Sequence, residues 1–266
     1  MLKEHLIIKT RPLANEKNVV FWKDYRVSVL ADRLFRVEQS KNKKFRDAAT
    51  QSVWFRDMPP QSFCVSEKDG FFLIQTETCT LALAENREDC YVEIGGKKTP
   101  ICNEGNLLGT YRTLDQCNGS TFIPAHWNKA EPDEKPVTLE NGVCSKTGVA
   151  VYDDAASVTL LATGQVCAER GDGTDEYVFA YGDDYRSAVK ALFMITGSAP
   201  LVPRFALGNW WSRYYAYTQE EYLTLLENFE QHDVPLTVAT IDMDWHYSIH
   251  LDEQKRITEQ NKNTEY

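Results

Sequence analysis

The stretch TIDMDWHY, residues 240–247, holds the side chains of this chain that are best suited by type and spacing to do chemistry. Asp242 and Asp244 are separated by one residue at the end of an apolar run, and His246 follows. Two carboxylates can act as a general acid/base pair. Together with a histidine they can hold Mn²⁺ or Mg²⁺. They can also clamp a sugar, because hydrogen bonds from hydroxyls to a charged acceptor are about twice as strong as neutral ones.

A strand, helix and strand pattern must position these residues. FALGNWW (205–211) predicts the first strand. Thr218 and Glu221 form a capping box, which predicts a helix over about 219–232. Its apolar face recurs at helical spacing and consists of Tyr222, Leu225, Leu226 and Phe229.

LTVATID (236–242) predicts the second strand, whose nearly continuous apolar character is typical of a strand buried on both faces. This order of elements predicts two parallel strands joined by a right-handed crossover. Asp242 and Asp244 would then leave the same face of the strand, at its carboxyl end. Two strands and one helix cannot cover both faces of a sheet, so either a partner or further chain is expected to complete this segment.

The chain before about residue 180 predicts a β-sandwich, because short β-branched and aromatic runs alternate there with turn signals. The clearest runs are YRVSVLADRLFRVEQ (25–39), FFLIQTETCTLALAE (71–85), YVEI (91–94) and SVTLLAT (157–163). A helix is expected over 183–197, because apolar residues share one face and Gly197 and Pro200 end it. The residues of this face are Tyr185, Ala188, Val189, Leu192 and Phe193. The predicted organisation is a β-sandwich domain (1–182), a linker helix (183–200) and an incomplete β-α-β segment (201–266).

Composition narrows the class of protein. The 266 residues are 42% hydrophobic and 26% charged, as in ordinary globular proteins. The net charge of -10 argues against a nucleic-acid partner, and no apolar run is long enough to span a membrane. The start of the chain does not have the pattern of a signal peptide. Seven scattered cysteines without a CxxC motif indicate reduced thiols, so a cytoplasmic location is expected.

Longer stretches resemble a known family. PLVPRFALGNWWSRYYAYTQEEYLTLLENFEQHDVPLTVATIDMDWH (200–246) is similar to the opening of the catalytic barrel of glycoside hydrolase family 31, the family of α-glucosidases and α-xylosidases. NLLGTYRTLDQCNG (106–119), GVCSKTGVAVYDD (142–154) and DEYVFAYGDDY (175–185) resemble segments of its N-terminal sandwich, in the same order. The chain departs from the family pattern at Leu108, where the family more often has glycine, and at Val149, where an aromatic residue is more usual.

The resemblance implies a mainly β fold: a galactose-mutarotase-like supersandwich followed by the start of a (β/α)8 barrel, which is truncated here. It also implies a retaining double displacement by two aspartates, with carboxyl groups about 5 to 5.5 Å apart. In the family both aspartates come from later barrel strands, so no catalytic residue is expected within this chain. The chain alone is expected to be inactive, and the full-length protein is expected to be an α-glucosidase that uses no cofactor and no metal.

The resemblance also implies which residues bind substrate. The first aspartate of the DxD-type motif binds hydroxyls of the sugar in the -1 subsite, and this role falls on Asp242, with Met243 alongside and Asp244 as support. Asp115 in RTLDQCNG lies on a sandwich loop that in the family reaches the barrel mouth, on the leaving-group side of the sugar. One of Trp211 and Tyr214, from the aromatic cluster 210–217, is expected to line the pocket, because sugar C–H faces pack well on aromatic rings.

Several alternatives stay open. Asp242 and Asp244 could pair with an arginine such as Arg213, Asp115 could form a turn, and the aromatic residues could be core. A non-catalytic carbohydrate-binding or scaffold protein, an α-xylosidase of the same family and a metal-dependent sugar transferase are the competing functions. The expected partner is an α-linked oligosaccharide, with no nucleic acid and no membrane; a homo-oligomer is left open.

Overall fold

The computed structural model describes Lys3 and residues 7–109, 139–167 and 173–242, together with the backbone of short strands at 117–118, 121–122 and 137–138. Its contacts divide the chain into two units, Met1–Ser198 and Ala199–Tyr266. No helix among the described residues is both long and apolar enough to cross a membrane.

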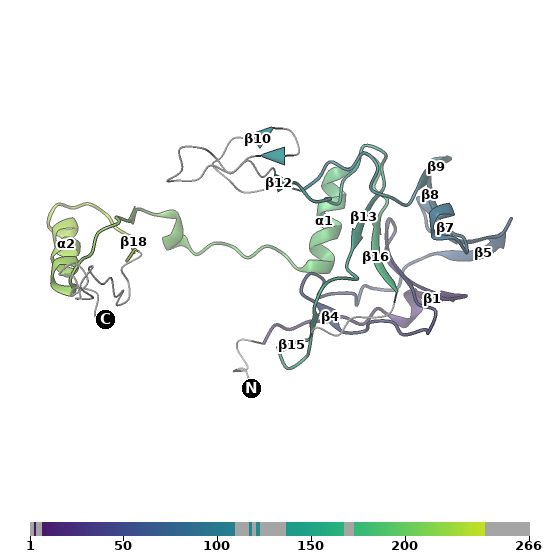
Figure 1. Cartoon of the computed structure of the whole chain (residues 1–266), viewed down its shortest axis with the longest axis horizontal. Coiled ribbons are helices and arrows are strands. Elements are labelled where there is room, and N and C mark those ends of the chain that lie inside the picture. Colours follow the sequence, from purple (N-terminus) through teal and green to yellow (C-terminus); the bar gives the residue numbers. More distant parts are fainter. Residues whose placement is uncertain are drawn as a thin grey trace, which may run out of the picture. The chain divides into compact units, whose positions relative to one another are not determined.

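The first unit contains two five-stranded antiparallel sheets (Figure 1). One sheet has the order β1-β2-β3-β16-β13, with β1 (Val19–Trp22), β2 (Tyr25–Ala31), β3 (Leu34–Gln39), β16 (Thr174–Phe179) and β13 (Ala150–Asp153). The other has the order β5-β6-β7-β8-β9, with β5 (Cys64–Lys68), β6 (Phe71–Gln75), β7 (Cys79–Leu83), β8 (Tyr91–Ile94) and β9 (Lys97–Pro100). The predicted β-sandwich is confirmed, and the predicted strand runs 25–39 and 71–85 each form a hairpin.

Shorter elements complete the unit. They are the strands β4 (Ala49–Thr50), β14 (Thr159–Leu160) and β15 (Val166–Cys167), which form one small sheet, and β10 (Cys117–Asn118), β11 (Thr121–Phe122) and β12 (Val137–Thr138), which form another. Single 3-10 turns lie at η2 (Glu16–Asn18) and η3 (Arg87–Asp89). The predicted strand over 157–163 is thus limited to two residues.

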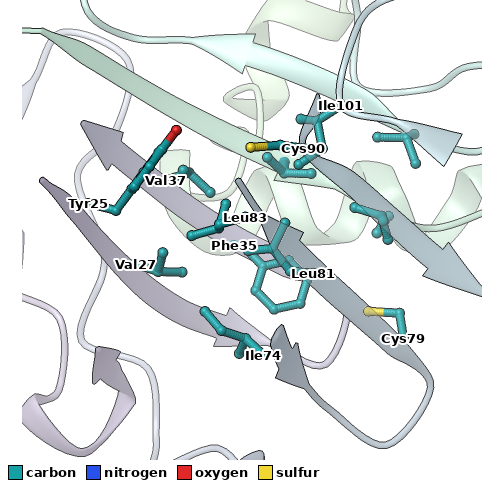
Figure 2. Close-up of a cluster of buried hydrophobic side chains, with 14 of the residues drawn as sticks. Tyr25, Val27, Phe35, Val37, Ile74, Cys79, Leu81, Leu83, Cys90 and Ile101 are labelled. Carbon is teal, nitrogen blue, oxygen red and sulfur yellow. The ribbon is translucent and has the colours of Figure 1, made fainter. Parts of the chain in front are cut away.

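The main core lies between the two large sheets, because alternate side chains of each strand point inward. Figure 2 shows Val27, Phe35 and Val37 of one sheet facing Ile74, Leu81 and Leu83 of the other. Cys79 and Cys90 are buried in the same cluster. None of the six cysteines in the described part of the chain forms a disulfide.

Helix α1 (Tyr185–Thr196) covers a second apolar cluster and ends at Gly197, as predicted, where φ is 92°. The predicted apolar face is buried in part, since Ala188 is buried and Leu192 packs against this cluster, but the other three residues are not buried. Ala188, Ala191 and Ile195 are buried, whereas Tyr185, Val189 and Phe193 remain 38%, 40% and 44% exposed. Two apolar stripes lie side by side on this helix. The small side chains of Ala188 and Ala191 allow the helix to approach the sheet closely.

The face of the β1–β13 sheet that is turned away from the main core, and that α1 partly covers, also buries charges. Arg36 donates from Nε and Nη2 to the two carboxylate oxygens of Asp175, at 2.7 and 2.8 Å, and Arg46 Nη2 donates to Oδ2 of the same group at 2.9 Å. Arg56 Nε donates to the hydroxyl of Tyr177 at 2.6 Å, and burial raises the pKa of that hydroxyl to about 12. Because Arg46 and Arg56 come from the loop between β3 and β5, these bonds hold that loop on the sheet.

Gly173 leads into β16 at a point of close approach. Its φ is +95°, and a Cβ there would lie 1.9 Å from the carbonyl oxygen of Gln39. We expect Gly173→Ala to lower the free energy of unfolding by about 3 kcal/mol or more, because backbone strain and a backbone clash act together. Gly70→Ala is the control, since Gly70 has a φ of +83° but nothing within 4 Å of a Cβ, and only the strain of about 1–2 kcal/mol applies. Urea denaturation compares the two, and equal losses would contradict the clash.

Candidate functional site

The second unit contains the predicted β-α-β segment. β17 (Trp210–Trp211) and β18 (Val238–Ala239) pair in parallel, and helix α2 (Gln219–Gln231) connects them. The capping box is confirmed: Thr218 Oγ1 accepts from the Glu221 N–H at 3.1 Å, and the Glu221 carboxylate accepts from the Thr218 N–H at 2.9 Å. The four residues of the predicted apolar face are half-buried, while most of the other residues of the helix are exposed.

Both predicted strands are shorter than expected. Residues Arg204–Leu207 form a 3-10 turn (η4) after Pro203, and the indole Nε1–H of Trp210 donates to the carbonyl of Ala206 at 2.9 Å. The predicted double-sided burial of 236–242 was also wrong, because these residues are half-buried or exposed. Among the described residues of this unit, α2 is the helix that covers the strands, and it covers one side.

The register of the two strands is set at their amino ends. The carbonyl oxygen of Asn209 accepts from the N–H and the hydroxyl of Thr237, each at 3.0 Å. A Cβ on Gly208 would lie 2.3 Å from Thr237 Oγ1, so glycine is required for this approach. The Asn209 amide also donates to the carbonyl of Pro235 at 2.8 Å. The neighbouring carboxyl ends of β17 and β18 are therefore held in a defined relation.

Asp242 lies three residues after Ala239, beyond the carboxyl end of β18, and its side chain is half-buried. β18 ends at Ala239, so Asp242 does not lie in a strand. The direction of its side chain is therefore not set by the alternation of side chains along β18, as the sequence had suggested. Met243 and Asp244 fall outside the described residues, as does Asp115. Of the expected sugar clamp, the structure describes Asp242.

The side chain of Trp211 is half-buried and packs against helix α2. Its ring packs edge-on against Phe229 of α2, with centroids 5.2 Å apart at an interplanar angle of 64°. Tyr214, in contrast, is 65% exposed. The guanidinium of Arg213 lies 4.7 Å from the ring centroid of Tyr215. The two rings therefore have different surroundings, since Trp211 packs on α2 and Tyr214 is exposed.

Two buried polar atoms lie near the carboxyl ends of the strands and were not predicted from the sequence. Trp211 Nε1 and Thr240 Oγ1 are buried and have no hydrogen-bond partner among the described residues. They belong to neighbouring chain segments, since the Thr240 N–H donates to the Trp211 carbonyl at 2.9 Å. Thr240 precedes Asp242 by two residues. The position of this polar residue inside the apolar run LTVATID was the signal in the sequence that could have predicted a polar group at the strand end. Both atoms can offer hydrogen bonds at the strand end where Asp242 lies.

A groove on this unit does not contain this strand end. An open groove of about 600 Å³ runs along α2 and β18 and is lined mainly by apolar residues, among them Leu226, Phe229, Val234, Leu236 and Val238. Asp242 is not part of its lining. No group of three or more His, Cys, Asp or Glu side chains in the described ranges could hold a metal ion; Asp244 and His246 lie outside those ranges.

Known proteins resemble the chain over both units. Residues 199–264 match the family model described as "Glycosyl hydrolases family 31 TIM-barrel domain". An alpha-xylosidase of Saccharolobus solfataricus is 36% identical over 83 residues, which is 31% of this chain and 11% of that protein. Alpha-glucosidase 2 of Bacillus thermoamyloliquefaciens is 29% identical over 189 residues, or 68% of this chain and 22% of that protein. The chain therefore spans less than a quarter of the length of these curated relatives.

Solved structures share the fold. A family 31 dextranase of Flavobacterium johnsoniae complexed with glucose has a TM-score of 0.55 at 12% identity, covering 85% of this chain and 32% of that one. A family 31 alpha-xylosidase from a soil metagenome complexed with xylose has a TM-score of 0.53 at 14% identity, covering 85% of this chain and 40% of that one. These likenesses support a β-sandwich followed by the start of a barrel. The family model, the two curated relatives and the shared fold together support a fragment of a glycoside hydrolase family 31 protein.

Proposed function

We propose that the whole protein carrying this chain is a retaining α-glycosidase that releases terminal α-linked glucose from oligosaccharides. The observation that carries the proposal is the position of Asp242 beyond the carboxyl end of β18, in a segment that matches the barrel model of the family. Barrel enzymes place substrate-contacting groups at this end of their strands. The likeness to an alpha-glucosidase over 68% of the chain favours glucose.

In this proposal Asp242 binds and does not break bonds. A half-buried carboxylate can accept hydrogen bonds from two sugar hydroxyls and orient the ring in the -1 subsite. Retaining hydrolysis needs two further carboxyl groups on opposite sides of the scissile bond. The nucleophile and the acid/base belong to the remainder of the barrel, so the 266-residue chain alone is proposed to be inactive.

An α-xylosidase is the second candidate, favoured by the 36% identity to an alpha-xylosidase over 83 residues. Xylose differs from glucose by the absence of the hydroxymethyl group. A pocket that accommodates this group gains about 1–3 kcal/mol from it, whereas a pocket that lacks room for it excludes glucose. The residues that surround this position decide between the two substrates.

A substrate comparison tests the proposal. We expect the whole protein to hydrolyse a nitrophenyl α-glucoside with a kcat/KM about 10-fold or more above that of the α-xyloside, because one matched group is worth about this factor. Proton NMR of the first product should show the α-anomer, and EDTA should leave the rates unchanged. A preference for the xyloside would select the second candidate, and an initial β-anomer would overturn the retaining mechanism.

A carbohydrate-binding or scaffold protein is the remaining alternative. It predicts that the whole protein binds an α-linked oligosaccharide in calorimetry without hydrolysing it.

A cytoplasmic location is likewise proposed, on the basis of the seven scattered cysteines.

A further inference from the structure

The carbonyl oxygen of Thr240 accepts a hydrogen bond from a tyrosine of the neighbouring helix. Thr240 directly follows β18, and its N–H donates to the Trp211 carbonyl of β17 at 2.9 Å. In a regular parallel ladder the same neighbouring strand also supplies a backbone N–H to the carbonyl, from two residues further along. β17 ends at Trp211, and the Thr240 carbonyl accepts from the hydroxyl of Tyr222 at 2.9 Å. The hydroxyl therefore takes the place of a strand hydrogen bond.

Tyr222 is itself held firmly at the start of α2. Its N–H donates to the carbonyl of Thr218 at 3.0 Å, so the residue that caps the helix also fixes the backbone from which the ring extends. The ring is half-buried and packs edge-on against Tyr217, with centroids 5.3 Å apart at an interplanar angle of 65°. A tyrosine that is fixed at its backbone and packed at its ring can hold a carbonyl in one place.

The contacts of Tyr222 continue into the connection between β17 and α2, residues 212–218. The ring of Tyr217 lies 4.6 Å from that of Tyr215, centroid to centroid. The guanidinium of Arg213 in turn lies over Tyr215. The chain after β17 and the chain after β18 are therefore both attached to one side chain of α2. The spacing of apolar residues predicted that Tyr222 faces inward, but it gave no role to the hydroxyl.

We propose that Tyr222 is a positioning residue that fixes residues 240–242 through the Thr240 carbonyl and thereby sets the place of Asp242. The last ladder pair of β18 is at Ala239, so the backbone that carries Asp242 lies beyond the strand pairing. A displacement of about 1 Å is enough to weaken the effect of a group that acts on substrate. The link to substrate rests on the proposed function, whereas the hydrogen bond to Thr240 stands on the geometry of this unit.

Hydrogen exchange of the whole protein tests the hydrogen bond. Tyr222→Phe removes the hydroxyl and keeps the ring, and the Thr240 amide, followed in the peptide 236–242, should exchange about 10-fold faster because the strand end opens more readily. Tyr217→Phe is the matched control, since the ring makes the contacts of Tyr217 with Tyr215 and Tyr222. Unchanged exchange in Tyr222→Phe, or equal acceleration in the control, would overturn the proposal.

A double-mutant cycle in the whole protein tests whether Tyr222 acts through Asp242. Tyr222→Phe should lower kcat/KM for a nitrophenyl α-glucoside about 10-fold in the parent, but less than about twofold in the Asp242→Asn background, because the group that it positions has already lost its charge. Tyr217→Phe should stay within about twofold of the parent. A general structural effect would lower kcat/KM equally in both backgrounds, and that result would overturn the positioning role.

The two experiments separate this inference from the proposed function. If the parent protein hydrolyses no α-glycoside, the proposed function fails, and the link from Tyr222 to substrate fails with it, while hydrogen exchange still decides the bond to Thr240. If the parent hydrolyses the glucoside and the two substitutions are additive, the proposed function stands and the positioning role of Tyr222 fails.

Discussion

Asp242→Asn in the whole protein is expected to lower kcat/KM for an α-glucoside by about 100-fold or more. Each hydrogen bond from a sugar hydroxyl to a charged carboxylate contributes roughly 1.5–3 kcal/mol, and about 1.4 kcal/mol corresponds to a tenfold change. Asparagine keeps one acceptor oxygen but removes the charge, and it introduces a donor where the substrate presents hydroxyls. Steady-state kinetics of the parent and the variant measure the loss.

Asp233→Asn provides the matched control. Asp233 is an exposed aspartate of the same β-α-β segment, it follows α2, and its φ of 54° is one that asparagine tolerates well. The control should retain kcat/KM within twofold. A loss below tenfold in Asp242→Asn would contradict the clamp, provided that both variants unfold at the temperature of the parent.

Asp175→Asn is expected to destabilise the β-sandwich by about 3–5 kcal/mol. Asp175 is buried and receives three hydrogen bonds from Arg36 and Arg46. Removing one partner of a buried ion pair leaves the other charge uncompensated, and that cost dominates. Urea denaturation followed by tryptophan fluorescence measures the change in the free energy of unfolding.

The comparison variant is Asp47→Asn. Asp47 also pairs with an arginine, since its Oδ1 lies 2.6 Å from Nη1 of Arg26, but its side chain is 60% exposed. Exposed pairs contribute about 0–1 kcal/mol, so this variant should unfold close to the parent. Equal destabilisation by the two substitutions would show that burial of the Asp175 pair does not matter.

The stability of the sandwich should also depend on pH through Asp175. Burial alone would raise the pKa of this carboxyl group, but the charge and hydrogen bonds of Arg36 outweigh it and hold the pKa below the ordinary value. Because the pKa is lower in the folded state, this contribution is present above the unfolded pKa of about 4 and is lost as the pH falls through the folded pKa. Asp175→Asn should therefore flatten the loss of stability below about pH 4.

Local signals in the sequence were enough to predict several helices and strands correctly. The capping box of Thr218 and Glu221 predicted the start of α2, because both partners lie within one turn. The alternation in 25–39 predicted β2 and β3, since neighbouring strands joined by a short turn depend on few other residues. The resemblance to glycoside hydrolase family 31 was likewise evident from the order of the motifs, and the comparisons support it.

Burial was harder to predict, because it depends on what lies opposite. On α1 the sequence offers two adjacent apolar stripes, and the sheet selected the one containing Ala188 and Ala191 over the one containing Val189 and Phe193. The apolar run 236–242 suggested a strand buried on both sides, but half of that burial requires structure other than the described residues.

The sequence by itself determined the resemblance to family 31 and the order of the helices and strands, because motifs and periodicity are local properties of the chain. Only the tertiary structure decided which distant groups meet. Arg36 and Asp175 are 139 positions apart, and Asn106 meets Gly142 across 36. Neither pairing has a periodic signal, since the fold brings these polar side chains together by packing strands whose contacts are set over the whole sandwich.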